Sequence, residues 1–231
     1  MKKIIIILSI IFFTSCKKEI TELEFEKKVM AEIFSSLIDS TCVDTRLLFK
    51  PPPPFGKPIF DKTGHYVKTD STKATKEEIQ NLKEWKDGII QIENDTSKII
   101  FAFNPVLRRN RKNIKDNFEK HFPKIIPSES KTEANTEYRF EYQNIKLNNK
   151  FKIKDISAFP SDRNVFWETE HNFIFSGVVD YTRIQFDKTK NHGILYGGFI
   201  CGRLCGQGFR FYIKKKNNKW IIDKMVRTWI S

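Results

Sequence analysis

The chain has 231 residues, of which 39% are hydrophobic and 13% aromatic, and its formal net charge is +13. A chain of this length and apolar content can bury one sizeable core or two small ones, which excludes wholesale disorder. Only one almost wholly apolar stretch reaches ten residues, and it lies near the N-terminus. The composition therefore also excludes a membrane protein with several spans.

The N-terminal residues have the organisation of a secretory signal. Lys2 and Lys3 form a basic start, residues 4–13 are apolar apart from Ser9, and small residues follow. This pattern predicts a signal peptide over residues 1–15. Ten helical residues span about 15 Å, roughly half of a hydrocarbon core, so an ordinary transmembrane helix is the weaker interpretation.

The tetrapeptide Phe13-Thr14-Ser15-Cys16 resembles the lipobox of bacterial lipoproteins. In that family the signal peptide is cut before the cysteine, and the thiol carries a diacylglycerol. The resemblance implies that Cys16 is the lipidated first residue of the mature chain and that acyl chains hold it at a membrane. Phe13 stands where the family usually has leucine, valine or isoleucine, and plain secretion is the alternative.

The expected location is therefore the cell envelope, at the outer rather than the inner membrane, with the folded domain outside the cytoplasm. Residues 16–20 form the anchor and its tether, and the four residues after the cysteine reach at most about 14 Å. The formal charge is −1 for residues 17–50, 0 for 51–100, +5 for 101–150 and +7 for 151–231. A basic face beside a bilayer favours anionic lipid headgroups or acidic envelope polymers as partners, not nucleic acid. A merely solvated basic surface is the alternative.

Two capping boxes mark helix starts in the N-terminal half. Thr21 and Glu24 frame the first, and apolar residues at helical spacing predict a core helix over residues 21–38. Thr75 and Glu78 frame the second, and Gly88 is expected to end that helix.

Proline and turn residues predict the segments around the second helix. The prolines at 51–54 and 58 make residues 51–74 an expected stiff loop rather than a ligand for proline-binding modules. Ile89–Ile92 and Lys98–Phe103 predict a hairpin, which Pro105 closes. A third helix is expected over Asn110–Phe122.

From about Thr136 the apolar period changes to two, which predicts an antiparallel sheet. Short turns at Asp187–Asn191 and Asn217-Asn218 favour a meander. The expected strands lie at or near Tyr138–Tyr142, Phe151–Ile153, Val165–Trp167, Asn172–Phe175, Val178–Asp187, Gly193–Cys201, Phe209–Lys215 and Trp220–Ile230. The predicted fold class is α+β, a single domain over residues 21–231 in which N-terminal helices pack on a curved sheet.

Five of the ten glycines lie between Gly197 and Gly208, interleaved with Cys201 and Cys205. The stretch lacks the pattern of a phosphate loop or a dinucleotide site, so a bulge or a tight turn between strands is expected. In an oxidising compartment, cysteines four residues apart predict a disulfide, with glycines at 202 and 206 letting the backbone fold back.

Two alternatives remain for these cysteines. A metal site could combine Cys201 and Cys205 with His192 and His171, although one Cys-x3-Cys pair is weak evidence for it. Cys42 is left over, either as a buried thiol or as a competing disulfide partner.

No motif of high specificity indicates catalysis, since neither a His-Glu-x-x-His nor a Gly-x-Ser-x-Gly pattern occurs. Glu168 and Glu170 are expected to form an exposed acidic strand edge rather than a catalytic pair. A basic cluster at the start of the third helix would suit an anionic partner, with a solvated loop as the alternative. Its members are Arg108, Arg109, Arg111, Lys112 and Lys115.

Several C-terminal segments together resemble the corresponding part of uncharacterised bacterial lipoproteins. They are residues 181–187, 199–208, 216–220 and 229–231, with 155–157 and the signal peptide in addition. The resemblance implies a helix followed by a curved sheet, and it carries no activity and no residue roles. The element order is also similar to that of cystatin-like and nuclear-transport-factor-like cones.

The first functional hypothesis is a lipid-anchored, non-enzymatic binding or structural protein of the envelope, without cofactor or metal. The alternative is a small hydrolase that uses a pocket in a cone-like sheet, with His192 or His171 as base. A deep pocket with a histidine hydrogen-bonded to a carboxylate would favour the hydrolase.

Overall fold

The computed structural model describes residues 20–48, 50–109, 115–128, 137–147 and 150–231. The helices are α1 (Glu22–Thr41), α2 (Thr45–Leu48), α3 (Lys76–Asn94), α4 (Lys115–His121) and α5 (Arg163–Glu168), with short 3₁₀ helices η1 (Ser71–Lys73) and η3 (Ile156–Ala158). The strands are β1 (Lys57–Phe60), β2 (Tyr66–Asp70), β3 (Ile99–Arg108), β4 (Tyr138–Arg139), β5 (Phe151–Asp155), β6 (Ile174–Thr182), β7 (Gln185–Phe186), β8 (His192–Gly202), β9 (Cys205–Lys216) and β10 (Lys219–Ile230). The predicted α+β class is confirmed.

The main sheet has eight strands in the order β10-β9-β8-β6-β3-β4, with β5 beside β3 and β7 beside β8. The predicted meander is confirmed for β8, β9 and β10, which pair antiparallel. It is wrong for β5 and β6, because both pair with β3 in parallel. A parallel pair needs a long crossover connection, and turn signals between neighbouring strands cannot reveal one.

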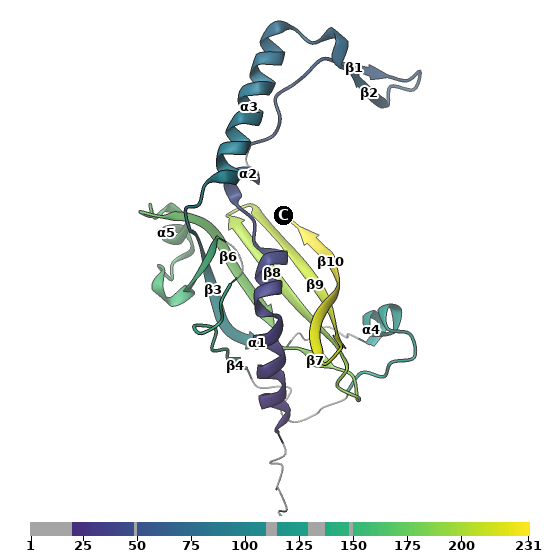
Figure 1. The fold of residues 1–231 in the computed structure, drawn as a ribbon, viewed down its shortest axis with the longest axis vertical. Helices are drawn as coiled ribbons and strands as arrows, with labels where there is room; N and C mark the ends of the chain where they lie inside the picture. The colour runs from purple at the N-terminus through teal and green to yellow at the C-terminus, as the bar shows by residue number, and fades with distance from the viewer. Residues whose placement is uncertain (1–19, 49, 110–114, 129–136, 148–149) are drawn as a thin grey trace, which may run out of the picture.

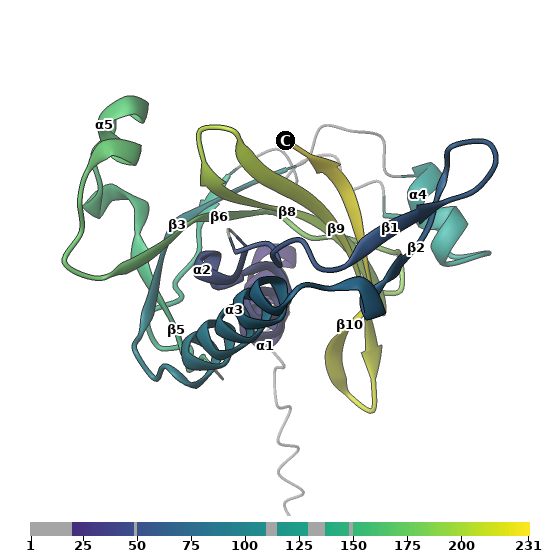
Figure 2. The same ribbon diagram turned by 90° about the horizontal axis from the view of Figure 1, so that it is seen from above.

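Helix α1 lies on the concave side of the sheet, whose strands curve around it from β3 to β10 (Figure 2). Its capping box forms as predicted, with the Glu24 amide donating to Thr21 Oγ1 at 3.2 Å and the Thr21 amide donating to Glu24 Oε2 at 3.0 Å. The apolar side of the helix is buried against the sheet through Val29, Met30, Ile33, Phe34, Leu37 and Ile38. The core of the domain is therefore the space between this helix and the sheet.

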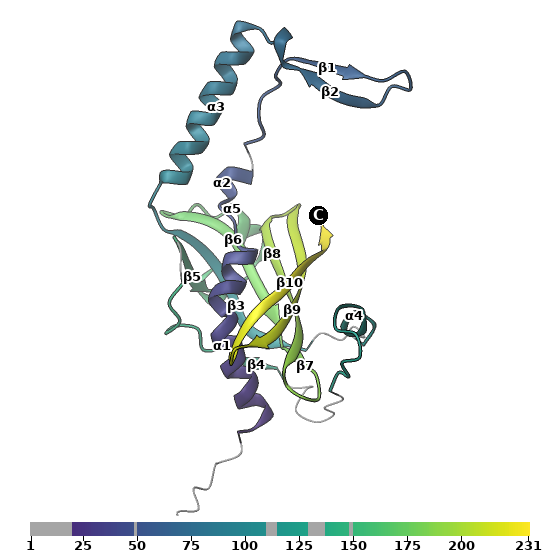
Figure 3. The same ribbon diagram turned by 45° about the vertical axis from the view of Figure 1, so that its right-hand side comes forward.

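Residues 51–94 form an arm that projects beyond the sheet, at the end of α1 opposite to its N-terminus (Figures 1 and 3). The predicted loop over 51–74 is wrong in part, because β1 and β2 pair as an antiparallel hairpin within it. The sequence hides these strands because nearly all their side chains are exposed, so no apolar alternation marks them.

Helix α3 runs through Gly88 to Asn94, so the predicted helix end and the strand at Ile89–Ile92 are both wrong. Ile89 and Ile92 continue the helical spacing of Leu82 and Trp85, which outweighs the strand preference of isoleucine. The predicted capping box does form, with the Glu78 amide donating to Thr75 Oγ1 at 3.1 Å. No residue of α3 is buried.

Four further boundaries differ from the prediction. The expected strand at Val165–Trp167 is helix α5, because the Asp162 carboxylate caps the amides of Asn164 and Val165. Strand β3 continues through Pro105 to Arg108. Strand β6 is continuous where two strands were expected, with a register shift beside Gly177. Only two residues of the expected strand Tyr138–Tyr142 pair in the sheet.

Two smaller clusters cover the other side of the sheet. Phe166 of helix α5 and Phe159, the residue after η3, pack against Ile100 and Ala102 of β3. Helix α4, the described part of the expected third helix, packs Phe118 against the sheet beside Ile194 and Tyr212. No helix in the described residues is both long and apolar enough to cross a membrane.

Candidate functional site

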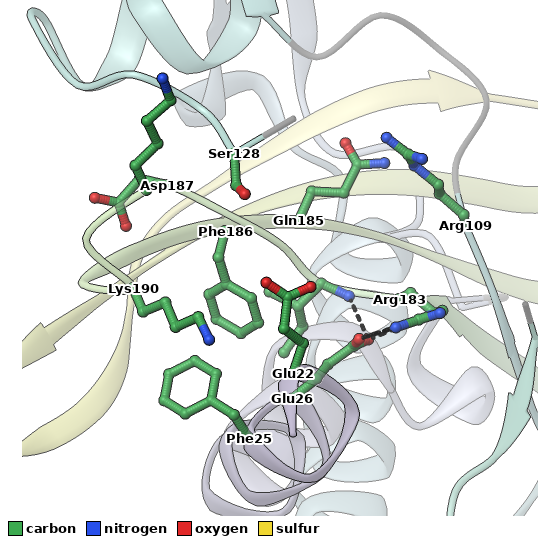
Figure 4. A pocket seen from close by; sticks show the side chains of 12 residues that line it. Glu22, Phe25, Glu26, Arg109, Ser128, Arg183, Gln185, Phe186, Asp187 and Lys190 are labelled. Carbon is green, nitrogen blue, oxygen red and sulfur yellow. Dashed lines mark hydrogen bonds and ion pairs between the residues drawn. The ribbon is translucent and has the colours of Figure 1, made fainter. Parts of the chain in front are cut away.

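A cavity of about 140 Å³ lies beside the first turns of α1 (Figure 4). Glu22, Phe25 and Glu26 of α1 form one wall, and the chain from Arg183 to Lys190 forms the opposite wall. Arg109 and Ser128 complete the lining. The Ser128 amide donates to the carbonyl of Phe186 at 2.9 Å, so backbone pairing holds the second wall in place.

A buried ion pair between Glu26 and Arg183 forms the inner end of the cavity. Arg183 Nη2 lies 2.6 Å and Nε 3.0 Å from Glu26 Oε2, and the Ile184 amide donates to Oε1 at 2.9 Å. The two side chains are 4% and 6% exposed. Burial raises the pKa of the Glu26 carboxyl, although the contacts with Arg183 and Ile184 act in the opposite direction.

Tyr138 closes the buried pair from the other side. The Arg183 guanidinium lies 5.4 Å from the centre of the Tyr138 ring, within cation–π range. Burial and the charge of Glu26 raise the pKa of the tyrosine hydroxyl well above its ordinary value. Arg183 is thus held between a carboxylate and an aromatic ring, so we assign it to the wall rather than to ligand binding.

Asp187 orders the turn between β7 and β8. Its carboxylate accepts hydrogen bonds from the amides of Asn191 and His192 at 2.8 Å each and from the amide and hydroxyl of Thr189. Burial raises the pKa of Asp187, but these hydrogen bonds outweigh burial and leave it lowered. The turn predicted at Asp187–Asn191 is confirmed, and its carboxylate is committed to the backbone.

The remaining polar groups of the cavity are mostly cationic. Arg109, Lys188 and Lys190 line it, and Lys190 Nζ lies 5.2 Å from the centre of the Phe25 ring. Figure 4 shows the Arg109 guanidinium beside the Gln185 amide, and the Glu22 carboxylate pointing inward from α1. Besides the paired Glu26 and Arg183 and the backbone-bonded Asp187, the charged residues of the lining are three basic residues and Glu22, which gives the cavity a positive balance.

The predicted basic cluster contributes one residue to this cavity, Arg109. Arg108 instead pairs with Glu137 at 2.8 Å, and Lys115 lies 3.9 Å from Glu119 on α4. Arg111 and Lys112 lie outside the described residues, as do the signal peptide and the expected lipidation site Cys16.

Cys201 and Cys205 form the predicted disulfide at the turn between β8 and β9, with their Cα atoms 5.1 Å apart. The predicted bulge or tight turn is confirmed, because the β8–β9 register shifts between Ile200 and Gly202 and the two-residue turn Arg203-Leu204 joins the strands. Neither Gly202 nor Gly206 has the left-handed conformation there. Cys42 is a free, buried thiol at the end of α1. The bonded sulfurs rule out the proposed thiolate metal site, and no group of metal-ligating side chains occurs within the described residues.

The histidines named for the hydrolase hypothesis do not line either of the two cavities described here. His192 Nδ1 lies 3.7 Å from Asp187 Oδ2, too far for a hydrogen bond, and His171 stacks on Phe173 at 4.7 Å. His121 does contact a carboxylate, with Nε2 2.7 Å from Asp223 Oδ2. That carboxylate also holds Lys214 at 2.5 Å, which gives the contact a role in fixing α4 on the sheet.

The predicted acidic edge is wrong as well, because Glu168 ends helix α5 and pairs with Arg203. The main site residues that sequence reasoning missed are Glu26, Arg183 and Lys190. Glu26 did carry a signal, since it interrupts the inward apolar stripe between Leu23 and Met30. No protein-family model matches the chain, and the comparisons with curated proteins and with solved structures also gave no match.

Proposed function

We propose that the protein is a lipid-anchored, non-enzymatic binding protein of the cell envelope, related to the bacterial lipoproteins that its N- and C-terminal segments resemble. The lipid on Cys16 would hold it at the outer membrane, and the cavity beside α1 would bind an anionic lipid headgroup. An acidic envelope polymer, which is also negatively charged, is the alternative partner.

One observation carries this proposal: the cationic cavity lies at the end of α1 to which the tether leads. Glu22 and Phe25, in the first turns of the helix, line the cavity. Residues 17–20 allow about 14 Å between the anchor and that helix. A headgroup in the same bilayer would therefore be within reach of Arg109, Lys188 and Lys190, where each basic residue adds about 1 kcal/mol of attraction.

The hydrolase alternative receives less support. It needs a histidine beside a pocket, and the two cavities described here contain none. The buried polar groups of the first cavity, Glu26, Arg183 and Asp187, are held by an ion pair and by backbone hydrogen bonds, an arrangement that suits binding without chemistry.

Vesicle flotation tests the headgroup proposal. The Cys16→Ser chain, free of lipid, is mixed with vesicles of phosphatidylglycerol and phosphatidylcholine or of phosphatidylcholine alone. We expect binding to the anionic vesicles and a loss of roughly fivefold in affinity for each of Arg109→Gln and Lys190→Gln. The matched control is Lys83→Gln with Lys86→Gln on the exposed α3. An equal loss in the control, or no preference for anionic vesicles, contradicts the proposal.

A further inference from the structure

A second and larger cavity, of about 440 Å³, lies farther along α1 and shares no lining residue with the first. Six of its nine lining residues are apolar or aromatic, namely Phe34, Tyr142, Ile145, Leu147, Phe151 and Ile153. Those six side chains also belong to, or pack against, the core between α1 and the sheet. The cavity is thus an opening into the side of the hydrophobic core.

Packing fixes the aromatic part of this wall. The Tyr142 ring lies 5.0 Å from Phe103 and 6.2 Å from Phe34, measured between ring centres. Phe34 and Phe103 are themselves buried. A wall held in this way does not collapse readily into the space, and a preformed apolar cavity is the usual form of a small-molecule site.

The polar groups of the lining are cationic or neutral. Lys98, Lys152 and Gln143 complete it, and neither lysine forms an ion pair with another described residue. In the sequence, residues 143–154 contain four lysines and no carboxylate. Lys150 is held by Asp44 at 3.1 Å, and the charged residues of the cavity lining are Lys98 and Lys152.

We propose that this cavity binds a free fatty acid, with the acyl chain against the apolar wall and the carboxylate at Lys98 and Lys152. The volume is near the lower end of the roughly 300–1,000 Å³ found for ligand pockets, which suits one acyl chain better than two. Apolar burial supplies most of the affinity, and the lysines supply the preference for a charged head.

Titration of the Cys16→Ser chain with cis-parinaric acid, a fluorescent fatty acid, tests the proposal without detergent. We expect saturable binding of one molecule per chain, displaced by oleate. Methyl oleate, which has no charge, is expected to compete roughly three- to tenfold less well, the range for two exposed charge contacts. Unsaturable binding, or equal competition by oleate and methyl oleate, overturns the proposal. This test uses no variant of the cavity.

Two sets of variants locate the ligand. Gln143→Trp, at an exposed lining position, is expected to obstruct the cavity and weaken binding at least about tenfold. Lys98→Gln with Lys152→Gln is expected to remove most of the preference for oleate over its ester. Lys83→Gln with Lys86→Gln is the matched control and should change neither. If Gln143→Trp disturbs the circular dichroism spectrum, Leu147→Phe replaces it as the obstructing variant. Unchanged binding of the fatty acid by a folded variant with either obstruction contradicts this location.

Discussion

Glu26 and Arg183 form an ion pair that is almost fully removed from water, between the start of α1 and the connection from β6 to β7. Desolvation of two charges offsets much of their attraction, so the pair contributes little net stability. Its partners are nevertheless strongly coupled, because either charge alone would be buried without compensation.

Arg183→Met is therefore expected to lower the free energy of unfolding by about 3–5 kcal/mol, since Glu26 loses its counter-charge. The double variant Glu26→Met with Arg183→Met should recover a large part of that loss. Urea denaturation of the two single variants and the double variant measures the coupling. Additive losses would show that the two side chains act independently.

Asp187 gives the protein a dependence on acid pH. Because its folded pKa lies below the unfolded value of 3.8, its contribution is complete above that pH and is lost as the pH falls through the folded pKa. We expect Asp187→Asn to cost about 2–3 kcal/mol near neutral pH and much less in strong acid. Denaturant unfolding at both pH values checks this, and a constant difference would contradict it.

At the scale of elements, the glycines of β9 make room for an aromatic side chain on β10. A Cβ atom at Gly208 would overlap the indole of Trp229, and one at Gly206 would lie 3.1 Å from it. An aromatic ring laid across glycines in a neighbouring strand shields their exposed backbone. The glycine-rich stretch therefore serves cross-strand packing in addition to the turn for which it was predicted.

Gly208→Ala is expected to destabilise the domain by about 1–3 kcal/mol through this overlap. Gly202→Ala is the matched control, since its nearest contact would be an ordinary 3.6 Å to Cys205. Thermal unfolding compares the two. Adding Trp229→Ala should relieve the clash in Gly208→Ala, and an unchanged deficit in that background would contradict the explanation.

The disulfide closes a loop with a sequence separation of 4, so it removes little entropy from the unfolded chain. We expect Cys201→Ser with Cys205→Ser to cost less than the ~3 kcal/mol typical of a 15-residue loop. Mass spectrometry of the alkylated protein establishes the bond in solution, and chemical denaturation gives the cost. Two alkylated thiols at these positions, before any reductant is added, would disprove the pairing.

The elements that the sequence predicted well have local causes. The capping boxes at Thr21 and Thr75 and the turn at Asn217-Asn218 act within a few residues, and all three form. The errors arise where packing is absent or distant. The β1–β2 hairpin buries no apolar face, and the parallel pairing of β3 with β6 joins segments about 75 residues apart.

Prediction of the site was limited because its residues are distant from one another in the sequence. The basic cluster around Arg109 was visible in the sequence, whereas the cavity is formed by α1 and by a turn some 160 residues later. Only the charge of Glu26 within an apolar stripe indicated that α1 meets a cation. Its partner Arg183 carried no local signal of burial.

In the whole molecule, α1 separates two ends with different properties. The cationic cavity lies at its N-terminal end, and the arm of β1, β2 and α3 projects from the other (Figure 1). An anchor at Cys16 would place the cavity next to the bilayer and direct the arm away from it. Both proposed ligands, a headgroup and a fatty acid, are available at such a surface.

Fractionation of cells that express the wild-type chain or Cys16→Ser tests the central claim most directly. After high-salt washing, which removes proteins held by charge alone, the wild-type chain is expected to remain with the membranes and the variant to be released in soluble form. A Cys16→Ser chain that stays in the washed membrane fraction would contradict lipid anchoring at this residue.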